Sequence, residues 1–194
     1  GEKVAYMVAY DRFRDRTGDI IQESNHYFCD DKKHDWSATV HYVRKHIEFR
    51  LKYFRENYGK TLDHFIFWSD NGECCCSAFI AEIGDLAEDY GITITWNFTA
   101  AGHSKGKHDG EGHVIKTECR SAISSDDILF NKQHEPYSVT LRNYMTKFFD
   151  EKSKFKRHFI SIPASEIAHH KAGSVLMGRL DGINSMHSFL IMSS

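Results

Sequence analysis

The sequence predicts an α/β fold in which a mixed β-sheet is flanked by helices. Three observations support this prediction. Two strand-like runs open the chain, amphipathic helices then alternate with short apolar runs, and turn signals separate these segments. The chain has 194 residues, of which 41% are hydrophobic and 13% aromatic, so it can bury a sizeable core.

The first two elements are expected to form an antiparallel hairpin. Residues Lys3–Phe13 and Ile20–Cys29 read as strands, and the charged segment Asp11–Asp19 between them contains the turn signal Thr17–Gly18. A long helix follows, because apolar side chains recur at steps of three and four residues: Val40, Val43, Ile47, Leu51, Phe54 and Tyr58. Asp35 or Ser37 can cap its start and Gly59 ends it.

Two helix-to-strand units come next. In chain order we expect a buried strand at His64–Ser69, a helix at Cys75–Tyr90, a strand at Ile92–Phe98 and a helix at Val114–Ile123. The last part of the chain predicts a smaller α+β extension: a helix at Tyr137–Phe149, a strand at Arg157–Pro163, and short strands at Val175–Met177 and Ser188–Ile191. We therefore expect a core at residues 1–123 and a C-terminal extension at residues 124–194 that packs on it.

Charge and cysteine content restrict the class of protein. The net charge of −2 argues against a strongly basic, self-sufficient nucleic-acid binder. Five cysteines, three of them adjacent at Cys74–Cys76, make a poor disulfide framework and favour a reducing, intracellular compartment. We see no signal peptide and no apolar run of the roughly 18 residues that a membrane span needs. Because the chain opens on Gly1 and almost directly on a strand, we expect upstream elements.

The stretch Ile92–Lys116 indicates a functional site. A strand leads into a segment rich in glycine, histidine and charge, expected to be a loop: it contains Gly102, Gly106, Gly110, Gly112, His103, His108, His113, Lys105, Lys107, Asp109 and Glu111. Asp70 ends the preceding strand, where open α/β sheets place ligand groups. Asp70 with Asp109 would form a carboxylate pair for a divalent metal.

Structural alternatives exist for each candidate. Asp70 can simply start the Asn71–Gly72 turn, and Asp109 can cap a helix. His103, His108, His113 and Cys119 form a weaker zinc hypothesis, because their spacing matches no zinc signature. The cations Lys105, Lys107, Lys116 and Arg120 can contact phosphate, whereas Lys152, Lys154, Lys156 and Arg157 are more typical of a solvated surface.

Four blocks of sequence resemble a known family. They are Cys29–Asp35, the strand end Phe67–Asp70 with Asn71–Gly72, the late triplet His187–Ser188–Phe189, and a more specific block made of Trp96, Phe98, Ala100, His103, Lys105, Gly106, Asp109, Gly110 and Gly112. Over residues 1–191 the chain resembles an uncharacterised family of transposon-derived animal proteins with an RNase H-like core of the DDE transposase and integrase type.

The resemblance implies an RNase H-like mixed sheet that opens with three antiparallel strands, of which the sequence shows two. It places the first strand, with an Asp, upstream of Gly1, and it makes Asp70 the second acid of a metal triad and Asp109 a candidate third. Glu111 or Glu118 would assist, with Mg²⁺ or Mn²⁺ as cofactor. Cys74–Cys76 replaces a polar stretch, and Ser104, Lys107, His108, Glu111 and His113 depart from the pattern of the loop.

Two hypotheses about function follow. In the first, the protein is a domesticated, catalytically impaired RNase H-like scaffold that binds DNA, RNA or protein within a larger chain or assembly, in the nucleus or elsewhere inside the cell. Its nucleic-acid contacts would come from His103, Lys105, Lys107, Lys116 and Arg120. In the alternative, it is an active metal-dependent nuclease or transposase domain that uses Asp70, Asp109 and Glu111. No membrane partner is expected.

Overall fold

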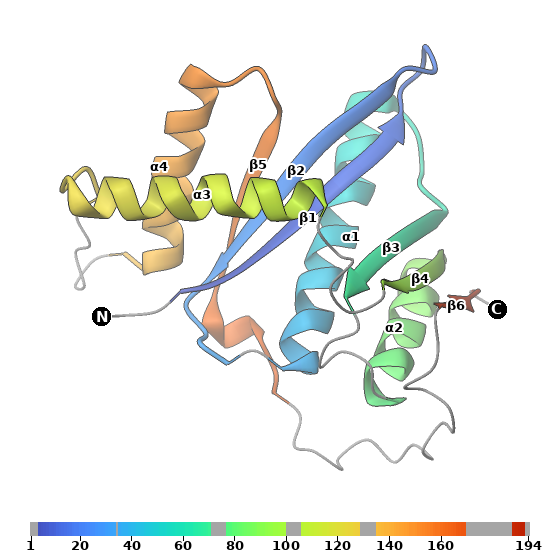
Figure 1. Cartoon of the computed structure of the whole chain (residues 1–194). Coiled ribbons are helices and arrows are strands. Elements are labelled where there is room, and N and C mark those ends of the chain that lie inside the picture. The colour runs from blue at the N-terminus through green and yellow to red at the C-terminus, as the bar shows by residue number, and fades with distance from the viewer. Residues whose placement is uncertain are drawn as a thin grey trace. The chain divides into compact units, whose positions relative to one another are not determined.

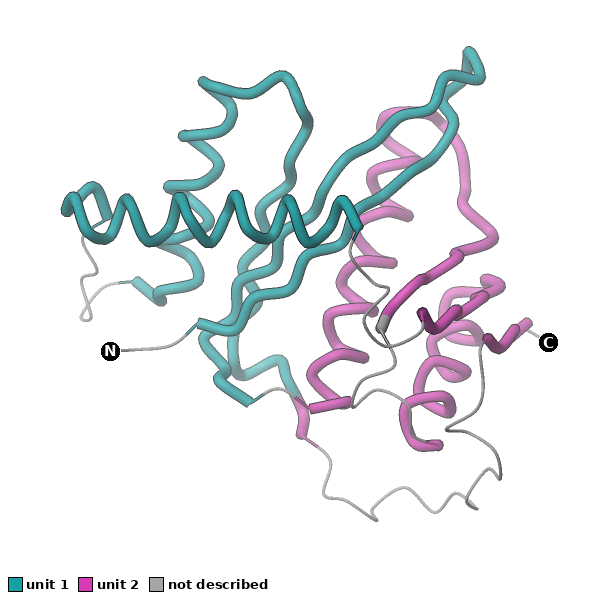
Figure 2. The backbone as a smooth tube through the Cα atoms, viewed as in Figure 1, with its two compact units in different colours: residues 1–33, 105–167 teal, residues 34–104, 168–194 magenta. Residues whose placement is uncertain are grey.

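The structure, a computed structural model, describes residues 4–33, 35–70, 77–99, 106–128, 135–169 and 188–192. Within these ranges it contains six strands, four α-helices and one short 3-10 helix, Ala164–Glu166 (Figure 1). The α/β class expected from the sequence is therefore confirmed. The chain divides into two compact units: residues 1–33 with 105–167 form unit 1, and residues 34–104 with 168–194 form unit 2 (Figure 2). The domain boundary expected at residue 123 stays a prediction.

Unit 1 is built on a three-stranded sheet with the order β1-β2-β5. Strands β1 (Ala5–Arg14) and β2 (Ile20–Cys29) form the expected antiparallel hairpin, with Ala5 opposite Cys29 and Arg14 opposite Ile20. Gly18 in the turn has a φ of 90°, which a residue with a side chain rarely adopts. Strand β5 (Arg157–Ile162) lies parallel to β2 on its other side.

Two helices pack on this sheet. Helix α3 (Lys107–Ser124) contacts β1, and helix α4 (Tyr137–Lys152) contacts β2 and β5. Their buried side chains form one apolar cluster with the sheet: Phe28, Ile115, Ala122, Ile128, Leu141 and Met145. This cluster fixes α3 on the sheet, and so determines which of its side chains reach solvent.

Unit 2 begins with the long helix α1 (Trp36–Tyr58), whose ends the sequence predicted. Asp35 is its N-cap, because an oxygen of its side chain accepts a hydrogen bond from the backbone N–H of Ala38 at 2.9 Å. Gly59 ends the helix in the left-handed conformation, with a φ of 60°.

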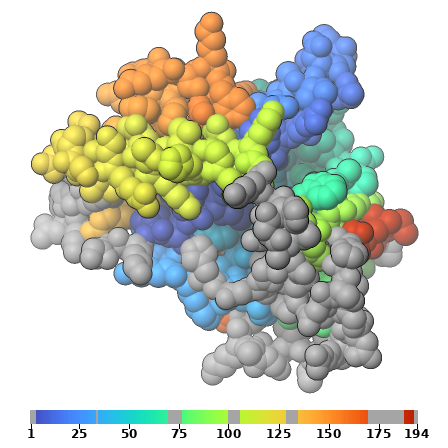
Figure 3. Space-filling view, in the orientation of Figure 1, coloured from blue at the N-terminus to red at the C-terminus, as the bar shows by residue number. Residues whose placement is uncertain are grey.

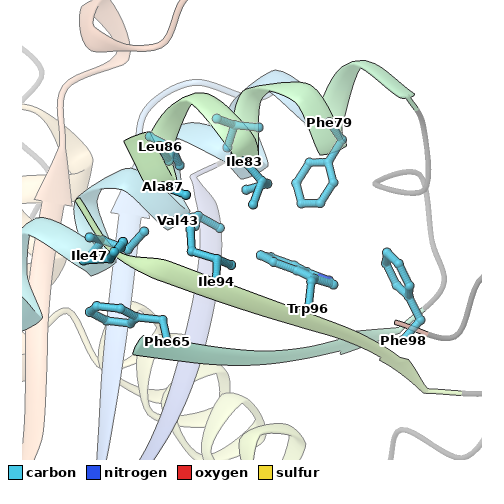
Figure 4. Packing of buried hydrophobic residues seen from close by; sticks show 12 residues of the cluster. Val43, Ile47, Phe65, Phe79, Ile83, Leu86, Ala87, Ile94, Trp96 and Phe98 are labelled. Atoms are coloured by element: carbon cyan, nitrogen blue, oxygen red, sulfur yellow. The ribbon is translucent and has the colours of Figure 1, made fainter. Parts of the chain in front are cut away.

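The sheet of unit 2 has the order β3-β4-β6. Strands β3 (His64–Asp70) and β4 (Thr93–Thr99) are parallel and are joined through helix α2 (Ser77–Tyr90), and β6 (Ser188–Ile191) is antiparallel to β4. The core of the unit lies between this sheet and the helices, where α2 places Phe79, Ile83, Leu86 and Ala87 over Ile94 and Trp96 of β4 (Figure 4).

The structure corrects three expectations. The helix expected from Val114 starts at Lys107, so Gly110 and Gly112 belong to its first turns and not to a loop. Strand β3 is not buried on both faces: Phe65 is 8% exposed, but Ile66 and Trp68 are 60% and 69% exposed. The described strands also form two three-stranded sheets instead of one: β1 and β3 are both edge strands, and they do not pair with each other. The short strand expected at Val175–Met177 lies outside the described residues.

Candidate functional site

Asp70 occupies the position that the sequence predicted, at the carboxyl end of β3. It is paired with Thr99 at the end of the parallel strand β4. The neighbouring Ser69 is tied to β4 twice: its hydroxyl accepts a hydrogen bond from Trp96 Nε1 at 2.9 Å, and its carbonyl accepts one from Thr99 Oγ1 at 3.1 Å. These bonds hold the two strand ends in register, at the edge of a parallel pair where ligands commonly bind.

Asp109 lies in the first turn of α3 and caps the helix. Its Oδ2 accepts a hydrogen bond from the backbone N–H of Gly106 at 3.1 Å and lies 3.6 Å from Nε2 of His108. A carboxylate at this position also meets the positive end of the helix dipole. The N-cap residue itself is Gly106, and Asp109 stabilises the start of the helix from the third helical position, as one half of a capping box.

The two residues of the expected metal pair belong to different units, Asp70 to unit 2 and Asp109 to unit 1. Within the described ranges, no group of three or more His, Cys, Asp or Glu side chains is arranged to hold a metal ion. Of the residues named for zinc, His103 lies outside the described residues. Cys119 packs beside the apolar cluster of unit 1, whereas His113 is exposed on α3.

Glu111 has a different environment from the one that the sequence suggested. It faces the sheet and forms a two-pronged ion pair with Arg157 of β5, with Nε to Oε2 at 2.9 Å and Nη2 to Oε1 at 3.1 Å. Ser24 Oγ lies 3.4 Å from the same Oε2 atom. The Arg157 guanidinium also lies over the rings of Phe149 and Phe155, 4.6 and 4.9 Å from their centroids. Glu111 therefore joins α3 to β2 and β5.

A buried chain of hydrogen bonds continues from Ser24 into the sheet. Ser24 Oγ lies 2.8 Å from Nε2 of His26, and Nδ1 of His26 lies 2.7 Å from the hydroxyl of Tyr6. Both Ser24 and His26 are 0% exposed. Burial lowers the pKa of His26 to about 3, and the positive charges of Arg157 and His158 act in the same direction. His26 is therefore neutral at physiological pH.

The protons of this chain have one consistent arrangement. The Glu111 carboxylate can only accept, so Ser24 Oγ donates its one proton to Glu111 and must accept from Nε2 of neutral His26. Nδ1 of His26 is then unprotonated and accepts a hydrogen bond from the Tyr6 hydroxyl. Burial, with Cys119 and Glu111 acting in the same direction, raises the pKa of Tyr6, so this hydroxyl stays protonated. Every donor thus has an acceptor, and the chain ends on the carboxylate that Arg157 holds.

Two of the cations predicted to bind nucleic acid rest on tyrosine rings. Lys107 Nζ lies 5.7 Å from the ring centroid of Tyr10, and Lys116 Nζ lies 5.6 Å from that of Tyr6. Lys107 also donates a hydrogen bond to Gln22 Oε1 at 2.7 Å. Both lysines are held against β1 and remain exposed, and neither has a carboxylate partner among the described residues.

Arg120 completes the part of the predicted basic cluster that the structure describes. Residues 113, 116 and 120 follow an i, i+3, i+7 pattern, so His113, Lys116 and Arg120 share one exposed face of α3. Figure 3 shows α3 at the surface of unit 1. His103 and Lys105, also predicted to contact nucleic acid, lie outside the described residues. Glu118 points elsewhere and accepts a hydrogen bond from the Tyr144 hydroxyl at 2.9 Å.

The block Cys29–Asp35 supplies helix caps. Asp30 accepts hydrogen bonds from the backbone N–H and the hydroxyl of Ser138, at 3.0 and 2.7 Å, at the start of α4. Asp35 caps α1, and its second oxygen lies 3.0 Å from Nδ1 of His169. Both carboxylates therefore stabilise the fold.

A family model covers residues 5–194 of the chain and is described as a domain of unknown function, DUF8701. The chain belongs to the DUF8701 family. No curated protein and no solved structure matches it. The match spans both units, so the residues of α3 and the end of β3 are all part of the DUF8701 domain. The described helices include none that is long and apolar enough to cross a membrane.

Sequence reasoning missed the buried chain that runs from Tyr6 to Arg157. Its members come from β1, β2, α3 and β5, up to 151 positions apart, and no local spacing joins them. One signal was present: Ser24 and His26 are polar residues two positions apart in a strand, which places both side chains on the same face.

Proposed function

We propose that this DUF8701 domain is a transposon-derived, RNase H-like scaffold that binds nucleic acid through the exposed cations of α3 and is catalytically impaired. It would act inside a larger chain or assembly, in which protein partners also bind. The nucleic-acid part of the proposal rests on the ring contacts of Lys107 and Lys116 and on the exposure of Arg120, and the fold part rests on the order of the elements.

The element order supports an RNase H-like fold. From β1 to α3 the chain runs strand, strand, helix, strand, helix, strand, helix, with β1 and β2 antiparallel and β3 and β4 parallel. The family that the sequence resembles opens with one further antiparallel strand. Successive antiparallel strands usually pair with each other. Such a strand would pair with β1, which ends its sheet among the described strands.

The proposal of nucleic-acid binding rests on one observation: the cations of α3 are not paired with carboxylates of the described residues. Lys107 and Lys116 rest on tyrosine rings, and Arg120 has no ion pair with a described residue. On helix α1 of unit 2, by contrast, Arg44, Lys45 and Lys52 lie within 3.1 to 3.9 Å of carboxylates. Cations that no carboxylate neutralises are available to phosphate groups, which supply most of the affinity for nucleic acid.

Impaired catalysis is supported by what the acidic residues of α3 do. Asp109 caps the helix, and Glu111 is bound to Arg157 on the inner side. A carboxylate that is already paired with a guanidinium must lose that pair before it can bind a divalent cation. The alternative, a Mg²⁺- or Mn²⁺-dependent nuclease, is favoured by one observation: Asp70 lies at the carboxyl end of a parallel strand pair.

Fluorescence anisotropy with a labelled 20-nucleotide single strand and the corresponding duplex tests binding. The variant Lys116→Gln/Arg120→Gln should weaken binding at least tenfold at 0.1 M salt. The control Lys52→Gln/Lys60→Gln removes the same charge from unit 2 and should bind like the parent. Equal loss in both variants would show a general charge effect and reject the α3 surface.

A nuclease assay decides between the two functions. The full-length protein is incubated with Mn²⁺ and a labelled DNA strand, beside its Asp70→Asn variant. We expect no cleavage above background from either protein. Cleavage by the parent that disappears in Asp70→Asn would establish the enzyme and contradict the impaired scaffold.

A further inference from the structure

One face of β1 carries a row of groups that meet cations. Alternate residues of a strand point to the same side. Tyr6 and Tyr10 therefore share a face with Arg12 and Arg14. Lys116 rests on Tyr6 and Lys107 on Tyr10, so positive charge lies over this face at four places along the strand.

Gln22 brings two of these cations together. It lies directly opposite Arg12 in the hairpin, so both side chains project from the same face with their Cβ atoms about 5 Å apart. The Oε1 atom of Gln22 accepts hydrogen bonds from Lys107 Nζ and from the Tyr10 hydroxyl, both at 2.7 Å. Lys107 is thus bound to Gln22, the residue directly opposite Arg12.

The side chain of Arg12 is exposed and makes no hydrogen bond, ion pair or ring contact with any described residue. The Arg14 side chain donates a hydrogen bond to the carbonyl of Gly18 at 2.7 Å and has no ion pair with a carboxylate in the described part of the chain. The nearest acidic side chain along the strand, Asp11, projects from the opposite face, where its Oδ2 accepts from Asn25 Nδ2.

The acidic residues of the hairpin turn are engaged locally. Asp15 accepts hydrogen bonds from the N–H and the hydroxyl of Thr17 and from the N–H of Asp19. These bonds lower the pKa of Asp15 and keep it ionised within the turn. Oδ2 of Asp19 lies 2.8 Å from the same Thr17 hydroxyl oxygen and shares its hydrogen with Asp15. Both carboxylates lie beyond Arg14, at one end of the cationic row.

We propose that Arg12 and Arg14 extend the cationic surface of α3 into one continuous row that binds the phosphodiester backbone of a single nucleic acid strand. This inference rests on the proposed function and adds residues to it. From Tyr6 to Arg14 the row is about 27 Å long at roughly 3.4 Å per residue. A single line of cations can contact the phosphates of one backbone at a time. That backbone can belong to a single strand or to one strand of a duplex.

Contacts of this kind give binding without sequence preference and with a steep dependence on salt. Each phosphate contact to a single strand contributes a slope of about 0.7 in the logarithm of the affinity against the logarithm of the salt concentration, and about 0.9 for a duplex. Loss of the Arg12 contact should therefore weaken single-strand binding about fivefold at 0.1 M salt.

The test uses Arg12→Gln and Arg12→Gln/Arg14→Gln in the full-length protein. Anisotropy is measured from 0.05 to 0.3 M NaCl with two 20-nucleotide single strands of different sequence and with a duplex. We expect the slope for single strands to fall by about 0.7 for the first variant and by about 1.4 for the second. The Lys52→Gln/Lys60→Gln control should keep the slope of the parent.

Failure of this inference can be told apart from failure of the proposed function. If the parent binds, Lys116→Gln/Arg120→Gln weakens it, and the Arg12 and Arg14 variants keep the parent slope, the row is wrong and the α3 surface stands. If the parent binds neither strand nor duplex, both proposals fall. A strong preference for one of the two sequences would also overturn the row, because backbone contacts do not read bases.

Discussion

Acid should weaken the attachment of α3 to its sheet through one buried histidine. His26 has a pKa of about 3 in the folded protein and about 6.5 when it is exposed. The unfolded state therefore takes up a proton first, and the stability that neutral His26 provides is complete above pH 6.5 and is lost as the pH falls from 6.5 toward 3. Between pH 7.5 and pH 5 the loss should be roughly 2 kcal/mol, from about 1.4 kcal/mol for each pH unit below 6.5.

The groups around His26 explain why protonation is costly. Arg157 and His158 repel an imidazolium, and the Tyr6 hydroxyl must turn because Nδ1 would become a donor. Glu111 Oε2, 4.0 Å from Nε2, is the acidic group that faces the ring, and Arg157 already binds it. Among the described residues, protonated His26 thus gains no free carboxylate to offset its desolvation.

Urea denaturation at pH 7.5 and pH 5 measures this effect. The His26→Gln variant is the reference, because glutamine keeps an amide that can bind Tyr6 and Ser24 but does not titrate. The free energy of unfolding of the parent should fall by about 2 kcal/mol more than that of the variant between the two pH values. Equal falls would refute the assignment of a depressed pKa to His26.

Three further predictions concern stability. Arg157→Met should cost about 3 kcal/mol, because it leaves the Glu111 carboxylate half-buried without its partner, and Glu111→Gln/Arg157→Met should recover part of the loss in denaturant titrations; a cost below 1 kcal/mol would contradict this. Asp35→Ala should lower stability by about 1 kcal/mol, and Asp35→Asn, which can still cap α1, should lower it less. Gly110→Ala should raise the melting temperature, since no atom of the described residues lies within 4 Å of the added Cβ and alanine favours helix by about 1 kcal/mol; a decrease would mean that α3 does not start at Lys107.

Short sequence patterns correctly predicted those elements whose structure depends on residues close together in the chain. The periodicity from Val40 to Tyr58 and the residues Asp35 and Gly59 gave α1 with both ends. The hairpin β1–β2 followed from two β-rich runs around Thr17–Gly18. These elements are specified by propensity and capping within a few residues, so the sequence alone was sufficient.

The start of α3 could not be read in the same way. Glycines disfavour a helix, and Gly106, Gly110 and Gly112 within seven positions indicated a loop. Tertiary packing overrides that preference: Gly112 is buried, and a Cβ at that position would meet Val8 Cγ1 at 3.6 Å. Asp109 also stabilises the first turn by capping it.

The candidate site was predictable in its positions but not in its contacts. Asp70 was correctly placed at the end of a strand, since a turn signal follows the apolar run. The partners of Glu111 and Lys107 come from strands far away in the sequence, namely Arg157 of β5 and Gln22 of β2. Such pairings depend on sheet order and register, which no short spacing encodes.

The most direct test of the account is the affinity of the Lys116→Gln/Arg120→Gln variant for a labelled 20-nucleotide strand, measured beside the Lys52→Gln/Lys60→Gln control at 0.1 M salt. We predict that the α3 variant binds at least tenfold more weakly than the parent and that the control binds as tightly as the parent. Equal affinity of all three proteins would contradict the claim that the exposed face of α3 binds nucleic acid.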